Sequence, residues 1–342
     1  MTNLSFIIPA YNASSTIVRC LDSIYTLALN ENDFEVICID DCSTDNTIEV
    51  IENYMQQHAN ITLLRQSENH RQGAARNRGI RESQGEYIMC VDADDEVENG
   101  IIQAIDKVKQ LKVDVLFCNY LWMYSNDNIE HRKMSLPDGY ITSGNDFCEQ
   151  YFDTITNTCP ISYIWKRDYL QNLGVPFLED RRMEDFDWIE RNVYGAKTVG
   201  YSSDIIYRVR TFENPTSTTH TCSPETSADW AHVGYRRMKF CDEIITRSPQ
   251  FAEKIIYQST CFVANVLKFR NLTKFSPRGI IQFKSRLGQE ALYYLIKKGG
   301  WSMQTFFCMN HLNFIAIINL VAFPLATFGR TLIRTVRQIR KR

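Results

Sequence analysis

The chain has 342 residues, of which 44% are hydrophobic and 23% are charged, and its formal net charge is -2. This length is sufficient for one large domain with a smaller appendage. The composition excludes disordered, collagen-like and low-complexity chains.

Strands and helices alternate over the first 120 residues. Short apolar runs predict buried strands, the first of which we expect to end before Pro9. Apolar residues at helical spacing predict the helices between them. Strands are predicted at residues 4–8, 35–39, 61–64, 87–91 and 113–118, and helices from about 16 to 28, 45 to 57, 72 to 83 and 100 to 111. This alternation is typical of βαβ units and of an α/β fold with a mostly parallel sheet.

The pattern loosens beyond residue 120. We expect a hairpin or an irregular excursion over 122–140, helices over 146–152, 163–173 and 184–194, a strand over 205–210, and helices from about 227 to 300. The predicted domains are therefore a catalytic domain over residues 1–220, a helical region over 221–300, and an apolar and basic tail over 301–342.

The C-terminal part of the chain, from residue 268 onward, is distinct in its charge. The segment from Lys268 to Arg342 holds 14 Lys and Arg residues and one acid, which leaves 24 basic and 39 acidic residues in the rest of the chain. Such asymmetry indicates a basic surface that faces the phosphates of a lipid or a nucleic acid. The apolar stretch 312–328 is borderline for a membrane span. It is followed by basic residues at helical spacing, which favour a helix on an anionic membrane surface, with a solvated tail as the alternative.

The cysteines and the N-terminal segment bear on the compartment. Four of the 11 cysteines lie inside apolar runs, and no Cys-x-x-Cys pair occurs, so we expect buried, reduced thiols and no zinc site. The chain enters its first predicted strand without a basic segment before it, so no secretory signal is expected. We therefore predict that the catalytic part is cytoplasmic. The four thiols are those of Cys20, Cys38, Cys90 and Cys118.

Polar clusters follow the first, second and fourth predicted strands, at residues 9–12, 40–45 and 92–95. The carboxyl ends of parallel strands lie at one edge of a sheet, so the three clusters can converge on one ligand. Asp40 and Asp41 can accept a hydrogen bond from a nucleobase N–H, or they form a structural turn. Asp45 is expected to cap the following helix.

Three carboxylates stand within four residues at the end of the fourth predicted strand. Asp92, Asp94 and Asp95 repel one another unless a cation or hydrogen-bond donors compensate them. Hard divalent ions such as Mg²⁺ prefer carboxylate oxygens. Asp92 and Asp94 lie on the same side of an extended segment, so one can reach a ribose and the other a metal. The alternative is an acidic, solvated turn, because so short a motif is weak by itself.

Three further motifs carry charge. Residues 73–75 are small and permit close approach, and the helix N-terminus and Arg76 both favour an anion, or the basic residues form a solvated helix face. A carboxylate among Glu184, Asp185 and Asp187 can deprotonate an acceptor hydroxyl, or these acids are placed to suit the helix dipole. Arg208 and Arg210 lie on one side of a strand and suit a leaving diphosphate, or they belong to a half-exposed strand.

Taken in order, these segments resemble family 2 glycosyltransferases with the GT-A fold, a Rossmann-like, mostly parallel α/β sheet. The resemblance covers about residues 1–220, and only the ordered set of motifs is specific. It rests on Ile7-Ile-Pro-Ala-Tyr-Asn12, Asp40-Asp-Cys-Ser-Thr-Asp45, Gly73-Ala-Ala-Arg-Asn-Arg-Gly79, Gly85-Glu-Tyr-Ile88 with Asp92-Ala-Asp-Asp95, Glu184-Asp185, and Tyr207-Arg-Val-Arg210.

The resemblance implies an inverting transfer of a sugar from a nucleotide-sugar, most simply a UDP-sugar, with Mn²⁺ or Mg²⁺. It implies a base at Asp185 and a metal ligand at Asp94. Uracil would lie at Asp40 or Asp41 and the ribose at Asp92. The full set of donor-binding residues that it implies is Pro9, Tyr11, Asn12, Asp40, Asp41, Arg76, Asp92, Ala93, Arg208 and Arg210.

The resemblance also implies synthesis of a bacterial surface polysaccharide at the inner membrane face, with a glycan or lipid-linked acceptor. The chain departs from the family at residues 212–215, which leaves the roles of Thr218 and His220 open. The motifs of a dinucleotide-binding dehydrogenase and of a P-loop phosphotransferase are absent. The remaining alternatives are a sugar-phosphate nucleotidyltransferase and a non-catalytic membrane-bound adaptor. The apolar run in the tail favours membrane over nucleic acid as the partner of the basic region.

Overall fold

The computed structural model describes residues 3–125, 127–152, 159–173, 175–211, 223–266 and 277–298. The chain divides into two compact units, Met1–His220 with Phe240–Ile255, and Thr221–Lys239 with Ile256–Arg342. The apolar and basic tail expected over 301–342 lies outside the described residues, so its predicted membrane association stays a prediction.

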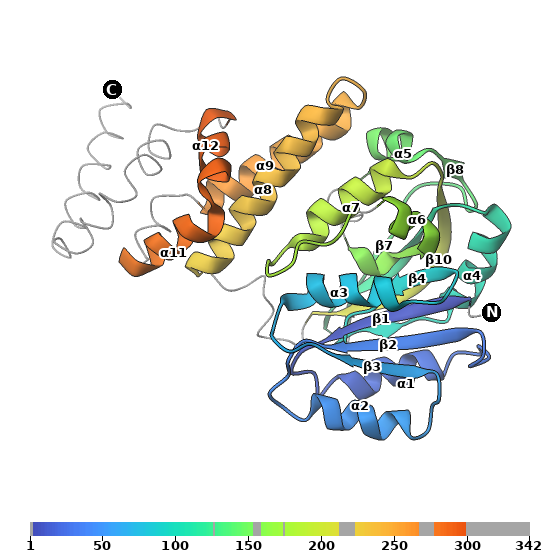
Figure 1. The fold of residues 1–342 in the computed structure, drawn as a ribbon. Helices are drawn as coiled ribbons and strands as arrows, with labels where there is room; N and C mark the ends of the chain where they lie inside the picture. Colours follow the sequence, from blue (N-terminus) through green and yellow to red (C-terminus); the bar gives the residue numbers. More distant parts are fainter. Residues whose placement is uncertain are drawn as a thin grey trace. The chain divides into compact units, whose positions relative to one another are not determined.

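The first unit is built on a mixed, mostly parallel sheet (Figure 1). Its strands follow the order β3-β2-β1-β4-β9-β6-β10-β5, with β7 paired to β6 and β8 to β10. The neighbours β3, β2, β1 and β4 are all parallel, as the sequence predicts. The strands are β1 (Leu4–Ala10), β2 (Phe34–Asp40), β3 (Ile61–Arg65), β4 (Tyr87–Cys90), β5 (Glu96–Val97), β6 (Val115–Ser125), β7 (Asn128–Arg132), β8 (Ile141–Thr142), β9 (Tyr163–Lys166) and β10 (Val199–Arg210).

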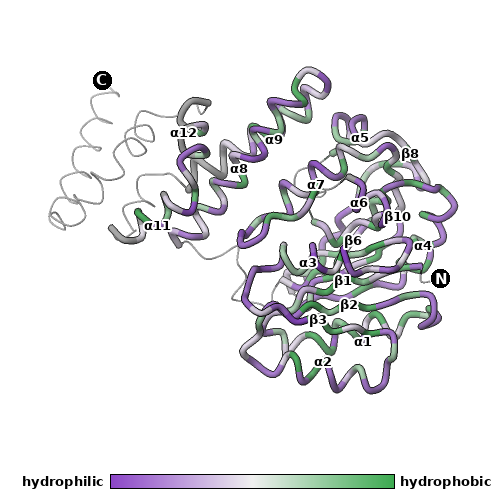
Figure 2. The backbone as a smooth tube through the Cα atoms, viewed as in Figure 1, coloured by the Kyte–Doolittle hydropathy of each residue, from purple (hydrophilic) through white to green (hydrophobic). Residues whose placement is uncertain are grey.

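Helices cover both faces of this sheet. On one face, Phe6 and Ile8 of β1 are fully buried in a core that includes the apolar stripe of α1. On the other face, Ile7 meets α3 at Gly79, where an added Cβ would lie 2.4 Å from the Ile7 side chain. In Figure 2, α1 and α2 alternate between apolar and polar segments, as expected for helices with one buried side. The helices are α1 (Ile17–Tyr25), α2 (Thr47–Met55), α3 (Arg71–Glu82), α4 (Gly100–Leu111), α5 (Gly144–Gln150), α6 (Arg167–Leu173) and α7 (Glu184–Gly195).

Strand β1 continues through Pro9, although we expected the proline to end it. The carbonyl of Ile7 accepts a hydrogen bond from Val91, so Ile7 directs its polar backbone groups toward β4. Pro9, two residues further, points the same way. Its missing N–H therefore lies beyond Cys90, the last residue of β4, where the sheet needs no donor.

The helix expected over 163–173 is wrong in its first four residues. Tyr163–Lys166 forms β9, an antiparallel strand between β4 and β6, and the helix α6 begins only at Arg167. Tyr163, Ile164 and Trp165 are fully buried there. Aromatic and β-branched side chains favour a strand in such a position, whereas the periodicity alone suggested a helix.

The second unit is helical in its described part. Helices α8 (Pro224–Ile244) and α9 (Pro249–Val266) contribute to both units, and α11 (Pro277–Leu287) and α12 (Gln289–Lys298) belong to the second. Asp229 of α8 is fully buried, and Arg286 of α11 donates to both of its carboxylate oxygens, at 2.6 and 3.1 Å. Within the described segments, no helix is long and apolar enough to cross a bilayer.

Candidate active site

The loops after β1 and β2 are joined at the edge of the sheet where the sequence places the donor. Asn12 has a left-handed backbone, with φ of 51°, and its side-chain oxygen accepts a hydrogen bond of 2.8 Å from the N–H of Thr44. The N–H of Asn12 donates to the Ser43 hydroxyl at 3.0 Å. Tyr11 between Pro9 and Asn12 is 51% exposed, so its ring is available to a ligand at this edge.

Asp40 and Asp41 are both buried at the end of β2. Asp40 accepts a hydrogen bond from the N–H of Ser43 through one carboxylate oxygen, and its other oxygen is buried without a partner. Asp41 accepts from Gln66 at 2.6 Å and from the N–H of His70 at 2.8 Å. Burial raises the pKa of Asp41, although these hydrogen bonds oppose the shift. The unpartnered oxygen makes Asp40 the better candidate for binding a nucleobase N–H.

Asp45 has a structural role. Its carboxylate accepts from Thr47 at the start of α2 and from the N–H of Ser14 in the neighbouring loop. Desolvation is the largest single effect and raises its pKa, but the hydrogen bonds from Ser14 and Thr47 together outweigh it and lower the pKa to about 2. The predicted cap is one residue early, because α2 begins at Thr47 with Asn46 at its N-cap, and Asp45 bonds the first N–H of the helix from the position before the cap.

The acidic motif after β4 places its three carboxylates in different surroundings. Asp92 is partly exposed and pairs with Arg76, and Asp94 is partly exposed beside the neighbouring α1 helix, whose Arg19 donates to the Asp94 carbonyl at 2.9 Å. Asp95 is buried. Ala93 is 8% exposed, so a larger side chain there would meet the surrounding core. The motif therefore presents Asp92 and Asp94, but not Asp95, toward a ligand.

Asp95 anchors the motif to β10. The Tyr207 hydroxyl donates to one Asp95 oxygen at 3.1 Å, and the N–H of Arg210 donates to the other at 2.8 Å. The same Tyr207 oxygen accepts a hydrogen bond from the N–H of Asp92 at 2.8 Å. Burial, together with the charges of Asp94 and Asp92, raises the pKa of Asp95 well above its usual value. Tyr207 thus contacts both ends of the motif.

Arg76 is enclosed between two carboxylates. Its guanidinium donates to Asp92 and to Glu184, each at 2.7 Å, and the Arg76 and Glu184 side chains are only 2% and 0% exposed. The guanidinium also lies over the ring of Phe177, at 5.3 Å from the centroid. In the sequence Arg76 suggested an anion-binding residue. The structure places it inside the protein, in contact with the candidate ribose ligand rather than at an open surface.

The small residues of α3 receive the segment that leads to α7. A Cβ added at Gly73 would lie 2.2 Å from the carbonyl oxygen of Leu178 and 3.1 Å from the side chain of Glu184. The side chain of Asn77 donates to the Phe177 carbonyl and accepts from the Phe177 N–H, at 2.9 and 2.8 Å. Helix α3 therefore fixes the approach to the first turn of α7, where Asp185 lies.

Asp185 is the second residue of α7 and stays partly exposed. Desolvation raises its pKa to about 6, which outweighs the opposing effect of the Arg76 charge. The adjacent Glu184, fully buried, also has a raised pKa, chiefly because of its burial and the charge of Asp185. A carboxyl with a raised pKa at a partly exposed position suits a general base.

Arg208 and Arg210, the expected diphosphate clamp, are each paired with an acid near β5. Arg208 forms an ion pair with Glu98, and Arg210 forms one with Glu96. The structure therefore brings both cations to the edge that carries the acidic motif, but it occupies them with carboxylates. Thr218, His220 and the unusual segment 212–215 lie outside the described residues.

Sequence reasoning included Glu184 and Tyr207 in its motifs but assigned neither of them a role. Glu184 carried a possible signal, since an acid next to the candidate base must be compensated, here by Arg76. Tyr207 offered none, because its contact with Asp92 and Asp95 depends on how β10 is aligned in the sheet. Among the residues that the structure describes, no group of three or more His, Cys, Asp or Glu side chains has the arrangement of a metal site.

Comparison with known proteins shows which family the N-terminal half of the chain matches. Residues 5–167 match the model of the family described as glycosyl transferase family 2. Over residues 5–167, the chain thus has the family 2 glycosyltransferase domain. It is 28% identical to the glycosyltransferase YibD of Escherichia coli over 212 residues and 29% identical to the glycosyltransferase EpsJ of Bacillus subtilis over 222 residues. These matches cover 60% and 63% of this chain, and 60% and 62% of the two relatives.

Solved structures show the same fold. The Staphylococcus aureus protein TarS, residues 1–349 in complex with UDP-GlcNAc, superposes with a TM-score of 0.61 over 93% of this chain and 89% of that one, at 17% identity. A mannosyltransferase from Pyrobaculum calidifontis, in complex with GDP-Man and Mn²⁺, covers 93% and 87% with a TM-score of 0.51 and 16% identity. The α/β fold with a mostly parallel sheet and a helical C-terminal region is thereby confirmed.

Proposed function

We propose that this protein transfers a sugar, with inversion, from a nucleotide-sugar to a hydroxyl of a glycan or lipid-linked acceptor. The observation that carries the proposal is the link through Arg76, which joins Asp92 of the donor motif to the helix that presents Asp185. A donor held at Asp92 would thus lie beside a carboxyl group with a raised pKa. The family supports glycosyl transfer over a nucleotidyltransferase or a non-catalytic adaptor.

The donor would lie across the carboxyl ends of β1, β2 and β4. Asp40 would accept the hydrogen bond of a nucleobase N–H, and Asp92 would bind the ribose. Tyr11 is exposed at the same edge and offers an aromatic face to the base. A UDP-sugar is the preferred donor class, and the likeness to a protein whose structure was solved with UDP-GlcNAc supports it.

The reaction would be a single displacement. The acceptor oxygen forms a bond to the anomeric carbon while its proton passes to the Asp185 carboxylate, and the bond from that carbon to the diphosphate breaks. The nucleoside diphosphate leaves with the bonding electrons. Attack opposite to the leaving group inverts the anomeric carbon. Asp185 must therefore be ionised before the reaction.

The carboxylate oxygens present fit a hard divalent ion. Asp95 is buried and held by β10, whereas Asp94 is partly exposed, so Asp94 would hold Mn²⁺ or Mg²⁺ together with oxygens of a bound diphosphate. When bound, such an ion offsets the negative charge that develops on the leaving diphosphate. The presence of Mn²⁺ in a protein of the same fold supports this choice.

The biological setting that we propose is surface polysaccharide synthesis at the cytoplasmic face of the membrane, with peripheral or monotopic attachment. The named activity of the S. aureus relative TarS, poly(ribitol-phosphate) β-N-acetylglucosaminyl transfer, supports a cell-surface polymer as the acceptor class. The basic composition of residues 268–342 supports attachment to an anionic surface.

The test is release of nucleoside diphosphate from a panel of UDP- and GDP-sugars, with Mn²⁺, with Mg²⁺ and with EDTA. We expect slow hydrolysis of one donor that EDTA abolishes and that Asp94→Ala abolishes as well. An Asp106→Ala variant, which removes an exposed acid of α4, serves as the control. Absence of turnover together with absence of donor binding by calorimetry would contradict the proposal.

A further inference from the structure

Strand β10 contains extra residues relative to its neighbour β6. Ser202 is opposite Cys118, and Tyr207 is opposite Tyr120. From Cys118 to Tyr120 the chain of β6 advances by two residues, whereas from Ser202 to Tyr207 the chain of β10 advances by five. The three extra residues of β10 form a bulge between Ser202 and Tyr207. A shift by an odd number of residues moves every later side chain to the other face of the sheet.

The bulge decides where Tyr207 points. With regular pairing after Ser202, Asp204 would stand opposite Tyr120, and Tyr207 would stand opposite Met123, on the other face. In the structure Tyr207 instead faces the same side as Tyr120 and reaches Asp95 and the N–H of Asp92. The geometry of the acidic motif thus depends on this irregularity in β10.

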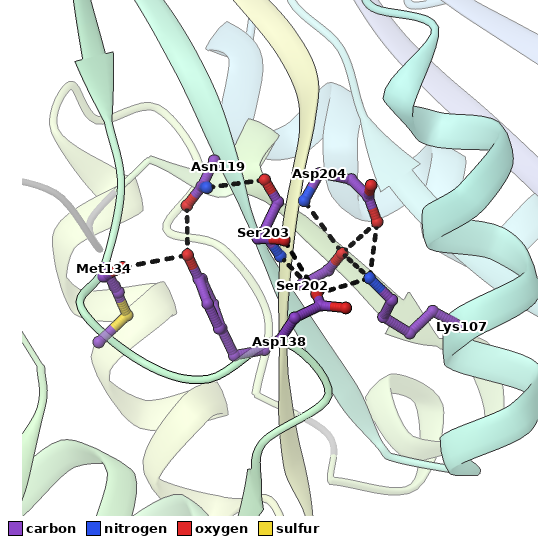
Figure 3. A network of polar contacts seen from close by, with 8 residues as sticks. Lys107, Asn119, Met134, Asp138, Ser202, Ser203 and Asp204 are labelled. Carbon is purple, nitrogen blue, oxygen red and sulfur yellow. Dashed lines mark hydrogen bonds and ion pairs between the residues drawn. The ribbon is translucent and has the colours of Figure 1, made fainter.

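A polar cluster holds the bulge (Figure 3). Lys107 of α4 donates to the Ser202 hydroxyl at 2.9 Å, to Asp204 at 2.8 Å and to Asp138 at 2.6 Å. The Ser202 hydroxyl in turn donates to Asp204 at 2.6 Å. One ammonium group therefore ties a helix, the bulge and the chain before β8 together. Its side chain is 18% exposed and that of Asp204 is 25% exposed, so their contact is partly shielded from water, whereas Asp138 forms the exposed end of the cluster.

The backbone groups of Ser203, inside the bulge, are also bonded. The N–H of Ser203 donates to Asp138 at 2.9 Å, and its carbonyl accepts from Asn119 of β6 at 2.9 Å. Asn119 also accepts from the Tyr201 hydroxyl at 3.0 Å. A bulge leaves backbone groups without strand partners, and here side chains replace those partners.

We propose that Lys107, with Asp204 and Asp138, is a positioning element of the donor site, which acts through the β10 bulge on Tyr207 and thereby on the Asp92–Asp95 motif. This inference rests on the proposed function. The hydrogen bonds of Lys107 reach Asp138, Ser202 and Asp204 and none of the proposed donor-binding residues, so its effect should appear in how well the motif holds the donor. Groups that orient ligands in this way contribute about 10–100-fold to affinity.

The test is a double-mutant cycle of Lys107→Met with Tyr207→Phe, in the full chain. The readouts are the donor dissociation constant by calorimetry with Mn²⁺, and KM and kcat for donor hydrolysis. Alone, Lys107→Met is expected to raise the dissociation constant and KM about tenfold. In the Tyr207→Phe background, Lys107→Met should raise the dissociation constant and KM by less than about twofold. The reason is that the hydrogen bonds from Tyr207 to the motif are already lost in that background.

Lys109→Met on the same helix is the matched control and should leave both constants unchanged. If Lys107→Met fails to fold, Asp138→Asn at the exposed end of the cluster replaces it, with the same expected pattern. Independent, multiplicative effects of the two substitutions, or no effect of the first, would overturn the inference. Wild-type turnover is measured beside them, and its absence would refute the proposed function instead.

Discussion

The guanidinium of Arg76 and the carboxylate of Glu184 lie 2.7 Å apart, although 108 positions separate them in the chain. Both side chains are buried. The other terminal nitrogen of the Arg76 guanidinium donates to the Asp92 carboxylate. The ion pair therefore connects the donor half of the site to the helix that carries the candidate base. Its energetic and functional consequences can be measured separately.

Removal of Arg76 should destabilise the fold. Arg76→Met would leave Glu184 as an uncompensated buried charge, which costs about 3–5 kcal/mol of unfolding free energy. Urea denaturation of the variant measures this cost. Arg81→Met, on an exposed position of the same helix, should change the free energy of unfolding by less than about 0.5 kcal/mol. Equal stability of the two variants would show that the buried pair contributes nothing.

The rate of hydrolysis should fall at acid pH. The pKa of Asp185 is raised to about 6, and the base must be ionised. The rate should therefore decrease as the pH falls through about 6 and level off above it. A profile of kcat against pH at saturating donor measures this limb, and a rate that stays constant down to pH 4 would exclude Asp185 as the base.

Glu184→Gln should shift the acidic side of the pH profile of kcat to lower pH. The substitution removes a negative charge beside Asp185 and leaves the Arg76 cation, which favours the ionised carboxylate. We expect a shift of less than about one pH unit, because the pKa of Glu184 is also raised and part of its charge is already lost in this range. Glu82→Gln on an exposed position of α3 should leave the profile unchanged. A shift toward higher pH would contradict the assigned electrostatics.

Gly73→Ala tests the close contact between α3 and the segment before α7. The added methyl group would lie 2.2 Å from the Leu178 carbonyl, so this backbone must move. We expect a loss of about 1–3 kcal/mol in stability, and a fall in kcat that exceeds the rise in donor KM, because the base is displaced more than the donor ligands. An unchanged kcat would indicate that the 177–184 segment does not position Asp185.

Much of the fold follows from local patterns. The parallel strands β1 to β4, with buried Cys20, Cys38 and Cys90 around them, carry their own apolar signal, and the rule for strand ends brings Asp40 and Asp92 to one edge. Strand β9 was mistaken for part of a helix, because its aromatic residues acquire their role only when they are inserted between β4 and β6.

Local sequence patterns do not predict which distant residues pair with each other. Arg76, Arg208 and Arg210 looked like anion ligands because nothing in the chain near them shows which acids they meet. The contacts of Tyr207 depend on the bulge in β10, which is set by Lys107 and Asp138 from other elements. Long-range register and ion pairing therefore require the structure, whereas the identity of the acidic motifs does not.

The measurement that tests the central claim most directly compares Asp185→Asn with wild type in two assays, donor binding by calorimetry with Mn²⁺ and turnover of the same donor. Loss of the base should lower turnover by about 10²–10⁴-fold, with the donor dissociation constant changed by less than about threefold. Turnover within about threefold of wild type would contradict the assignment of Asp185 as the base that activates the acceptor.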